Sequence, residues 1–257
     1  ATIARDRHQD RPANARGSFD WNAWAANRAS ISYIDARVDL GSAEERAHHE
    51  SAAAYSRGEL GNVELVQPAN SGDLVMLGEA LADRGDEAAA GYANALRVVE
   101  PTDADAVLAR LRFKQKRFDE AAALLESAFA RSRSDPWPNV DTIGRALDLA
   151  VALSNNHHYA PRMFEALERP FAAGQWEDAR KIDRAFISNL MEGCGPHTVA
   201  ALQSLEPWAP WRRDVLKLRA DCYGTAMLSD LHERAQRDLD AFTKSEPLPL
   251  LSSSDRR

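Results

Sequence analysis

Apolar side chains recur at helical spacing on both sides of a short polar break at Arg84-Gly85-Asp86. Before the break, Leu74, Leu77 and Leu81 predict a helix that Ser71 or Asp73 can cap and that Gly85 ends. After the break, a second helix is expected over 87–99, and Pro101 closes the unit. That second helix is predicted to bury one face made of Ala88, Tyr92, Ala95, Leu96 and Val99.

A second stretch, over about 103–133, repeats this arrangement. Its first helix is expected to bury Val107, Leu108 and Leu111, and its second helix to bury Ala121, Leu124, Leu125, Ala128 and Phe129. Ala88 and Ala121 each follow an acidic helix start and lie about 33 residues apart, a spacing that indicates stacked helical hairpins. The segment Gly174-Gln175-Trp176-Glu177-Asp178-Ala179 is a third, weaker copy of the turn, and Pro170 should end the helix before it early.

Further apolar stripes predict helices in the rest of the chain, with boundaries marked by Pro196, Pro207 and Pro210. The expected ranges are 20–37, 43–57, 139–154, 196–206, 211–226 and 228–243. We divide the chain into a disordered lead-in, an N-terminal helical pair, a helical repeat domain and a flexible tail, over 1–19, 20–60, 71–245 and 246–257.

The two clear units resemble tetratricopeptide repeats (TPRs), a family of helix-turn-helix units of about 34 residues. The first unit supplies Leu77-Gly78, Gly85-Asp86, Ala88, Tyr92, Ala95 and Pro101, and the second supplies Leu108-Ala109, Phe118, Ala121, Leu125, Ala128 and Pro136. The first turn is one residue short, and the second has Lys116-Arg117 in place of glycine. The resemblance implies an all-α fold of antiparallel helical hairpins stacked as a right-handed superhelix, or α-solenoid, that is irregular toward the C-terminus.

In that family, the first helices of successive units line a concave groove. By the family pattern, the groove of this chain would carry Glu79, Asp83, Arg110, Phe113 and Lys114, an acidic set followed by a basic one. A mixed-charge groove suits an extended peptide or a helix of another protein. The alternative is that residues 20–57 cover this face.

Composition agrees with an ordinary soluble, helical chain. Apolar residues make up 44% and charged residues 28% of the 257 residues, and runs of β-branched residues are almost absent. The net charge is −7 and the basic residues are scattered, which argues against nucleic-acid binding. No apolar run is long enough for a membrane span. The compartment stays unknown, with the cytoplasm slightly favoured.

Candidate chemistry is sparse. We expect Cys194 and Cys222 to be reduced and partly buried, with a bridge between them as the alternative. Gly193-Cys194-Gly195-Pro196 is interpreted as a loop between helices, although His197 beside Cys194 leaves a thiol nucleophile conceivable. His157-His158 is interpreted as a solvated helix end. We therefore assign no catalytic, cofactor-binding or metal-binding residue and expect no cofactor.

The segment Trp208-Ala209-Pro210-Trp211 allows two interpretations. Two indoles around a proline could plug the corner between two helices, which we favour, or could form an exposed aromatic patch for a partner.

Three functions follow from these patterns. The first is a non-catalytic scaffold of TPR type that binds a protein or peptide. The second is an accessory C-terminal arm of a larger enzyme, for example a fused polyamine-synthase-like protein, or of a membrane protein, since the chain begins at Ala1 without a methionine. The third is a helical enzyme using Cys194 and His197.

Overall fold

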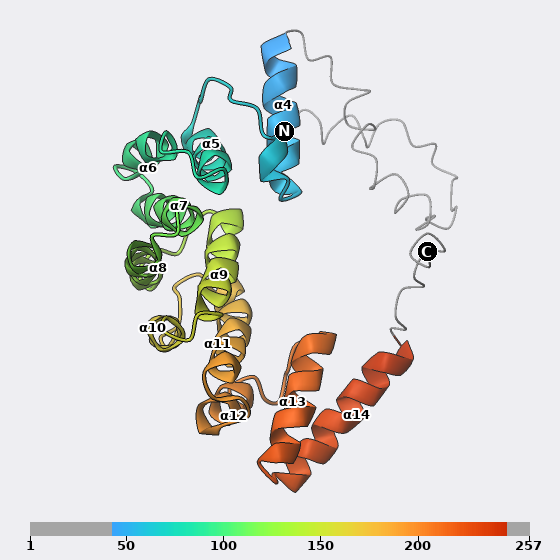
Figure 1. Ribbon diagram of the computed structural model, residues 1–257. Coiled ribbons are helices and arrows are strands. Elements are labelled where there is room, and N and C mark those ends of the chain that lie inside the picture. Colours follow the sequence, from blue (N-terminus) through green and yellow to red (C-terminus); the bar gives the residue numbers. More distant parts are fainter. Residues whose placement is uncertain (1–42, 246–257) are drawn as a thin grey trace, which may run out of the picture. The chain divides into compact units, whose positions relative to one another are not determined.

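The computed structural model describes residues 43–245, and these are helical almost throughout (Figure 1). The described residues contain eleven α-helices, two short 3-10 helices and no strand, which confirms the all-α class for this part of the chain. The α-helices are α4 (Ala43–Ser56), α5 (Ser71–Asp83), α6 (Ala89–Leu96), α7 (Pro101–Lys114), α8 (Phe118–Ser132), α9 (Val140–Ser154), α10 (Ala160–Ala166), α11 (Glu177–Glu192), α12 (Pro196–Gln203), α13 (Arg213–Thr225) and α14 (Ser229–Ser245).

The chain divides into two compact units, Ala1–Arg46 and Ala47–Arg257. Of the first unit, only the start of α4 is described, so the account below concerns the second. The predicted lead-in over 1–19, the helix over 20–37 and the tail over 246–257 lie outside the described residues.

Helix starts follow local capping chemistry. The side chain of Asn70 accepts a hydrogen bond from the backbone N–H of Asp73, so Asn70 is the N-cap of α5, and the prediction of Ser71 or Asp73 was wrong. Pro101 does not close the first unit but opens α7, where its missing N–H costs nothing. Gly85 follows Arg84, the C-cap of α5, and has a φ of 72°, a conformation that favours glycine.

The register of α6 is shifted by one residue from the prediction. The helix begins at Ala89 and buries Ala89, Ala93 and Leu96 completely. Ala88 lies in the turn and is exposed, as are Ala95 and Val99, so the predicted buried face was wrong at these positions. The turn after α5 runs to Ala88, so α6 begins only at Ala89 and presents Ala89, Ala93 and Leu96 to its neighbours.

Small residues let the first hairpin close tightly. A Cβ atom added at Gly78 of α5 would lie 3.1 Å from Val107 Cγ1 and 3.3 Å from Tyr92 Cβ, which is closer than ordinary contact. In the next hairpin, Ala109 and Ala121 are fully buried between α7 and α8. The predicted close approach is therefore seen at Gly78, and the small residues of the second hairpin are buried as expected.

Successive helices pack in a regular order. The pairs α5–α6, α7–α8, α11–α12 and α13–α14 are in contact, and α5 also packs on α7, α7 on α9 and α9 on α11. Figure 1 shows these helices side by side in chain order. Between α10 and α11, the 3-10 helix Gly174–Trp176 forms the third turn, and α10 ends before Pro170, as the sequence predicted.

Three apolar clusters form the core. One joins α4 to α5, α6 and α7, the second spans α7 to α11, and the third joins α11, α12, α13 and α14. Two helices contribute to neighbouring clusters: α7 to the first and second, and α11 to the second and third. The third cluster is linked to the rest of the unit through α11.

A disulfide connects Cys194, in the loop between α11 and α12, to Cys222 of α13, so the expectation of reduced cysteines was wrong. The two residues are 28 apart in sequence, and Cys222 is fully buried in the third cluster. Sequence spacing could not reveal the pair, because only the packing of α13 against the α11–α12 loop brings the Cα atoms to 4.7 Å.

Candidate functional site

Three of the predicted groove residues meet at one point. Asp83 near the end of α5 accepts from Arg110 of α7 at 2.7 Å, and Lys114 Nζ lies 3.0 Å from the same oxygen. Burial alone would raise the pKa of the Asp83 carboxyl, but the two cations outweigh burial and hold it below its usual range. The charges of this face are thus paired with each other.

Glu79 lies one turn earlier on α5 and is almost fully buried, at 2% exposure. Its Oε2 accepts from Arg145 Nε of α9 at 2.7 Å, and Arg145 Nη2 lies 2.6 Å from the same atom. Sequence reasoning missed Arg145 because the contact spans 66 residues. The sequence did hold one indication of such a partner. Glu79 lies among the apolar residues of its helix, and a buried charge needs a partner of opposite charge.

Tyr55 of α4 covers this ion pair. The guanidinium carbon of Arg145 lies 4.3 Å from the centre of the Tyr55 ring, a cation–π distance. Burial, and next the charge of Glu79, raise the pKa of the Tyr55 hydroxyl. Tyr55 belongs to the 20–57 segment. At Glu79, the predicted groove is therefore covered by that segment, as the alternative interpretation of the sequence expected.

Phe113, the apolar member of the predicted set, is half-buried at the end of α7. Its ring meets Phe118 at the start of α8 edge-on, with centroids 5.5 Å apart. Phe118 in turn meets Tyr159 at 6.2 Å. These contacts fix the turn between the two helices, so Phe113 contributes to packing whether or not a partner also touches it.

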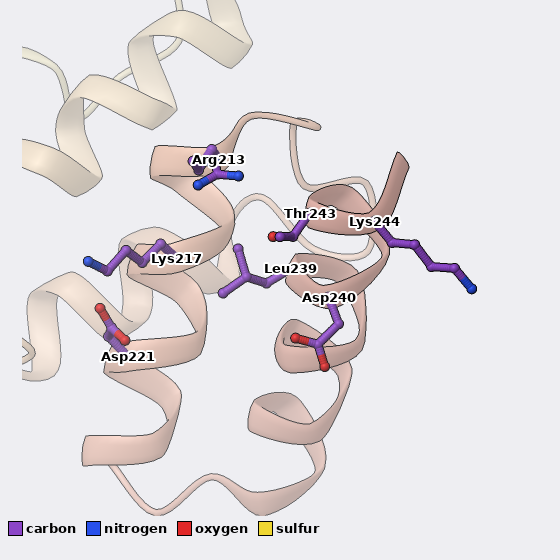
Figure 2. A pocket seen from close by; sticks show the side chains of 7 residues that line it. All are labelled: Arg213, Lys217, Asp221, Leu239, Asp240, Thr243 and Lys244. Atoms are coloured by element: carbon purple, nitrogen blue, oxygen red, sulfur yellow. The ribbon is translucent and has the colours of Figure 1, made fainter. Parts of the chain in front are cut away.

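The C-terminal hairpin carries an open groove between α13 and the second half of α14, which we call the hairpin groove. It consists of two adjoining hollows of 470 and 590 Å³ that share Arg213 and Lys217. Figure 2 shows Leu239 and Thr243 of α14 pointing toward α13, whereas Lys244 points away from it. The remaining lining residues are Trp211, Arg212, Asp214, Asp221, Asp240 and Phe242.

An aromatic pair forms the apolar end of the hairpin groove. The rings of Trp211 and Phe242 are 5.7 Å apart, and the guanidinium carbon of Arg213 lies 5.9 Å from the Phe242 ring centre. Trp211 is 49% exposed and Trp208 is 88% exposed. The prediction that Trp208 plugs a helix corner was wrong, because Ala209 and not the indole packs against the third cluster.

The disulfide removes the free thiol that the hypothesis of a Cys194 nucleophile requires. Cys194 is bonded to Cys222 and carries no thiolate in this state. The His197 side chain instead pairs with Glu192, Nδ1 to Oε2 at 2.9 Å. Among the described residues, no group of three or more His, Cys, Asp or Glu side chains is placed to hold a metal ion.

The histidines of the 155–159 turn lie on the surface. His157 and His158 are both exposed, and the His158 ring stands edge-on to Tyr159 with centroids 4.9 Å apart. In residues 43–245, no helix combines the length and apolar content that crossing a membrane requires.

In comparisons with known proteins, no family model, no curated protein and no solved structure matches this chain. The functional argument therefore depends on the residues and their geometry.

Proposed function

We propose that this chain is a TPR-like α-solenoid that acts as a non-catalytic scaffold and binds a segment of another protein. The observation that carries the proposal is the packing order of the helices. Every second helix packs on the one before it in the series, from α5 to α7 to α9 to α11. In solenoid proteins, helices stacked in this order line the binding face. In this chain α5 and α7 are buried over most of their length, and their C-terminal ends, which carry Asp83, Arg110 and Lys114, are the partly exposed portion of that face.

The partner is a protein or peptide. The surface of this face mixes acidic and basic groups, represented by Asp83, Arg110 and Lys114, and such a surface suits a mixed-charge segment better than nucleic acid. Glu79 is excluded from direct contact because it is buried against Arg145.

A charge swap tests the binding face without leaving charges unpaired. The variant Asp83→Lys/Arg110→Glu/Lys114→Glu keeps opposite charges together but reverses the potential that a partner meets. A matched control reverses the exposed pair Glu233 and Arg237 on α14, whose closest atoms are 3.8 Å apart. Affinity capture from cell extract, followed by mass spectrometry, compares the three proteins.

We expect wild type and the α14 control to capture the same partner and the swapped variant to lose it. Equal capture by all three proteins would mean that the α5–α7 face is not the binding face. If wild type captures no protein reproducibly, the scaffold function itself fails.

A further inference from the structure

Helix α4 is attached to the helical array by few residues. Only Ser51, Ala54 and Tyr55 of α4 are buried, and α4 makes no extensive contact with any other described helix. The hydrogen bonds of the Ser51 side chain join it to the backbone of Glu64, which lies in the connection to α5. Helices α5, α6 and α7, by contrast, pack closely on one another. Because local stability follows the density of buried contacts, α4 should open more easily than the helices beneath it.

Two side chains on one side of α4 reach helices of the array. His48 Nε2 lies 2.8 Å from Asp73 Oδ1 in the first turn of α5, and the Tyr55 ring lies over the guanidinium of Arg145 on α9. His48 and Tyr55 are seven residues apart, which places them about two turns apart on the same side of the helix. Asp73 and the ion pair of Arg145 with Glu79 thus form the surface that α4 covers, which we call the covered face.

The fit of α4 on the covered face is incomplete. The Tyr55 hydroxyl is buried close to Thr142 and Glu79 but makes no well-formed hydrogen bond with a described residue. A buried hydroxyl without a partner costs free energy, because it has given up its hydrogen bonds to water. A helix that fills the same place without this cost would compete with α4.

The connection after α4 allows the helix to move while the array stays intact. Gly58 has a φ of 77°, and a Cβ atom added there would meet no neighbouring group within 4 Å. Directly afterwards, Leu60 and Val63 are buried in the first apolar cluster. Arg84 at the end of α5 also donates to the carbonyl oxygen of Val63 at 2.8 Å. Rotation of the backbone near Gly58 would therefore release α4 and leave the 60–63 segment anchored.

The covered face adjoins the proposed binding face. Glu79 lies one turn before Asp83 on α5, and Asp83 pairs with Arg110 and Lys114 where that face is partly exposed. A partner segment that binds at Asp83 and continues along α5 would meet α4.

We infer that α4 is an internal occupant of the binding face and that a helix of a partner protein takes its place. The contacts of α4 define the chemistry of that helix. It carries an aromatic side chain that lies over Arg145 and, two turns earlier on the same side, a side chain that donates a hydrogen bond to Asp73. This inference rests on the proposed scaffold function, because it names the kind of segment that the scaffold binds and the element that must move first.

The test adds a fluorescein-labelled peptide of residues 43–57 to the full chain in fluorescence anisotropy titrations. The peptide competes with α4 for the covered face, so wild type should bind it weakly. Tyr55→Ala removes the ring that holds α4 on Arg145 and should bind the peptide at least tenfold more tightly than wild type. A second peptide, with alanine in place of its tyrosine, should bind the Tyr55→Ala chain at least tenfold more weakly than the first.

A conservative variant should act in the opposite direction. Tyr55→Phe keeps the ring over Arg145 and removes the hydroxyl that lacks a partner, so α4 should be held more firmly and the peptide should bind no more tightly than to wild type. Glu50→Ala, at an exposed position of α4, is the matched control and should bind like wild type. Circular dichroism melting establishes that each variant is folded before its affinity is compared.

Hydrogen exchange measures the opening of α4 directly. In wild type, the amides of α4 should exchange at least tenfold faster than those of α7. Tyr55→Ala should raise the exchange rate in α4 and Tyr55→Phe should lower it, and both should leave α7 and α8 unchanged.

Three results would overturn the inference. Failure of Tyr55→Ala to bind the peptide more tightly than wild type would mean that α4 does not occupy the peptide's site. Exchange in α4 as slow as in α7 would make α4 a fixed part of the array. A wild-type dimer in sedimentation velocity that the peptide dissociates would make α4 of a second copy the occupant.

The outcome for α4 is separable from the outcome for the scaffold. If the peptide does not compete with α4 but the charge swap at Asp83, Arg110 and Lys114 still abolishes partner capture, the inference fails and the scaffold function stands. If the peptide competes as expected but the wild type captures no partner, the covered face accepts a helix and the scaffold function fails.

Discussion

The carboxyl of Asp103 lies in the first turn of α7 at 2% exposure, where the backbone N–H of Asn139 donates to its two oxygens at 3.2 and 3.3 Å. Burial raises the pKa of this carboxyl to about 7, outweighing the Asn139 hydrogen bond, and the negative charges of Glu100 and Asp135 add to the rise. Near neutral pH, one core carboxyl therefore titrates in the folded protein.

We predict that Asp103→Asn reduces the pH dependence of stability. An unfolded aspartate titrates near 3.9, so the folded state binds the proton more tightly. The stabilisation is complete below about pH 4 and is lost as the pH rises through about 7. Because one pKa unit corresponds to about 1.4 kcal/mol, the variant should be more stable than wild type by on the order of 1–3 kcal/mol at pH 8. The amide oxygen still accepts from Asn139.

Urea unfolding at pH 5 and pH 8 measures this effect as the difference between variant and wild type. Asp183 of α11 serves as a second case, since burial and the nearby charge of Asp148 also raise its pKa to about 7. Asp183→Asn should shift stability in the same direction and add to the first change. An Asp103→Asn difference that is the same at both pH values would contradict the assignment.

At the scale of the element, the decisive feature is which alanine of α6 faces its neighbours. Ala89 is fully buried, whereas Ala88, the last residue of the turn, is exposed, although the sequence pattern fits either alanine. At Gly78 of α5, an added Cβ would lie 3.3 Å from Tyr92 Cβ of α6 and 3.1 Å from Val107 of α7, so the three helices approach one another closely. The register is therefore set by the packing of α5, α6 and α7 together.

We predict that Ala89→Leu destabilises the protein and Ala88→Leu does not. Extra methylene groups at a filled position force side chains off their rotamers, at a cost of about 1–3 kcal/mol. An exposed substitution usually stays within about 0.5 kcal/mol. Thermal and urea unfolding of the two variants compare them directly. Equal destabilisation, or a larger effect at Ala88, would show that α6 is rotated from the described register.

At the scale of the described molecule, the disulfide adds a covalent link where packing is sparse. The contacts of α12 with α13 are few compared with those within each hairpin, and Cys194–Cys222 joins the α11–α12 loop directly to α13. Within the third cluster, Arg219 is fully buried and held by Glu206 and Asp238 at 2.6 and 3.0 Å. The bridge and this buried ion network fix the α13–α14 hairpin.

We predict that Cys194→Ser/Cys222→Ser lowers the free energy of unfolding by about 2–4 kcal/mol, the typical contribution of a disulfide. Hydrogen exchange should rise more in α13 and α14 than in α7 and α8, because the third cluster loses its covalent link. Wild type with a dithiol reductant should behave like the double variant.

A mass measurement provides the control. The chain has two cysteines, so wild type denatured without reductant should take up no alkylating reagent, and reduced wild type should take up two equivalents. Alkylation of the unreduced protein would contradict the bridge. Since disulfides persist in oxidising compartments, an intact bridge in protein isolated from its source would argue against the slightly favoured cytoplasmic location.

Some contacts of the candidate sites could be predicted from the sequence pattern, and others join residues far apart in the chain. The family pattern brought Asp83, Arg110 and Lys114 onto one face, and the structure joins them within ion-pair distance. The family pattern gave no indication of Arg145, which lies on α9, two helices after α7, and pairs with Glu79. Trp211 drew attention in the sequence, but its neighbour Phe242 belongs to another helix, so the hairpin groove was not visible.

The sequence by itself determined that the described residues form helices and located several of their ends, because apolar spacing, prolines and glycines act within a few residues. Gly85 at the first turn and Pro196 at the start of α12 are such cases. Only the tertiary structure decided that Ala89 is buried, that Cys194 meets Cys222 and that Arg145 pairs with Glu79. These outcomes depend on how whole helices pack, and packing energy is shared among residues far apart in the chain.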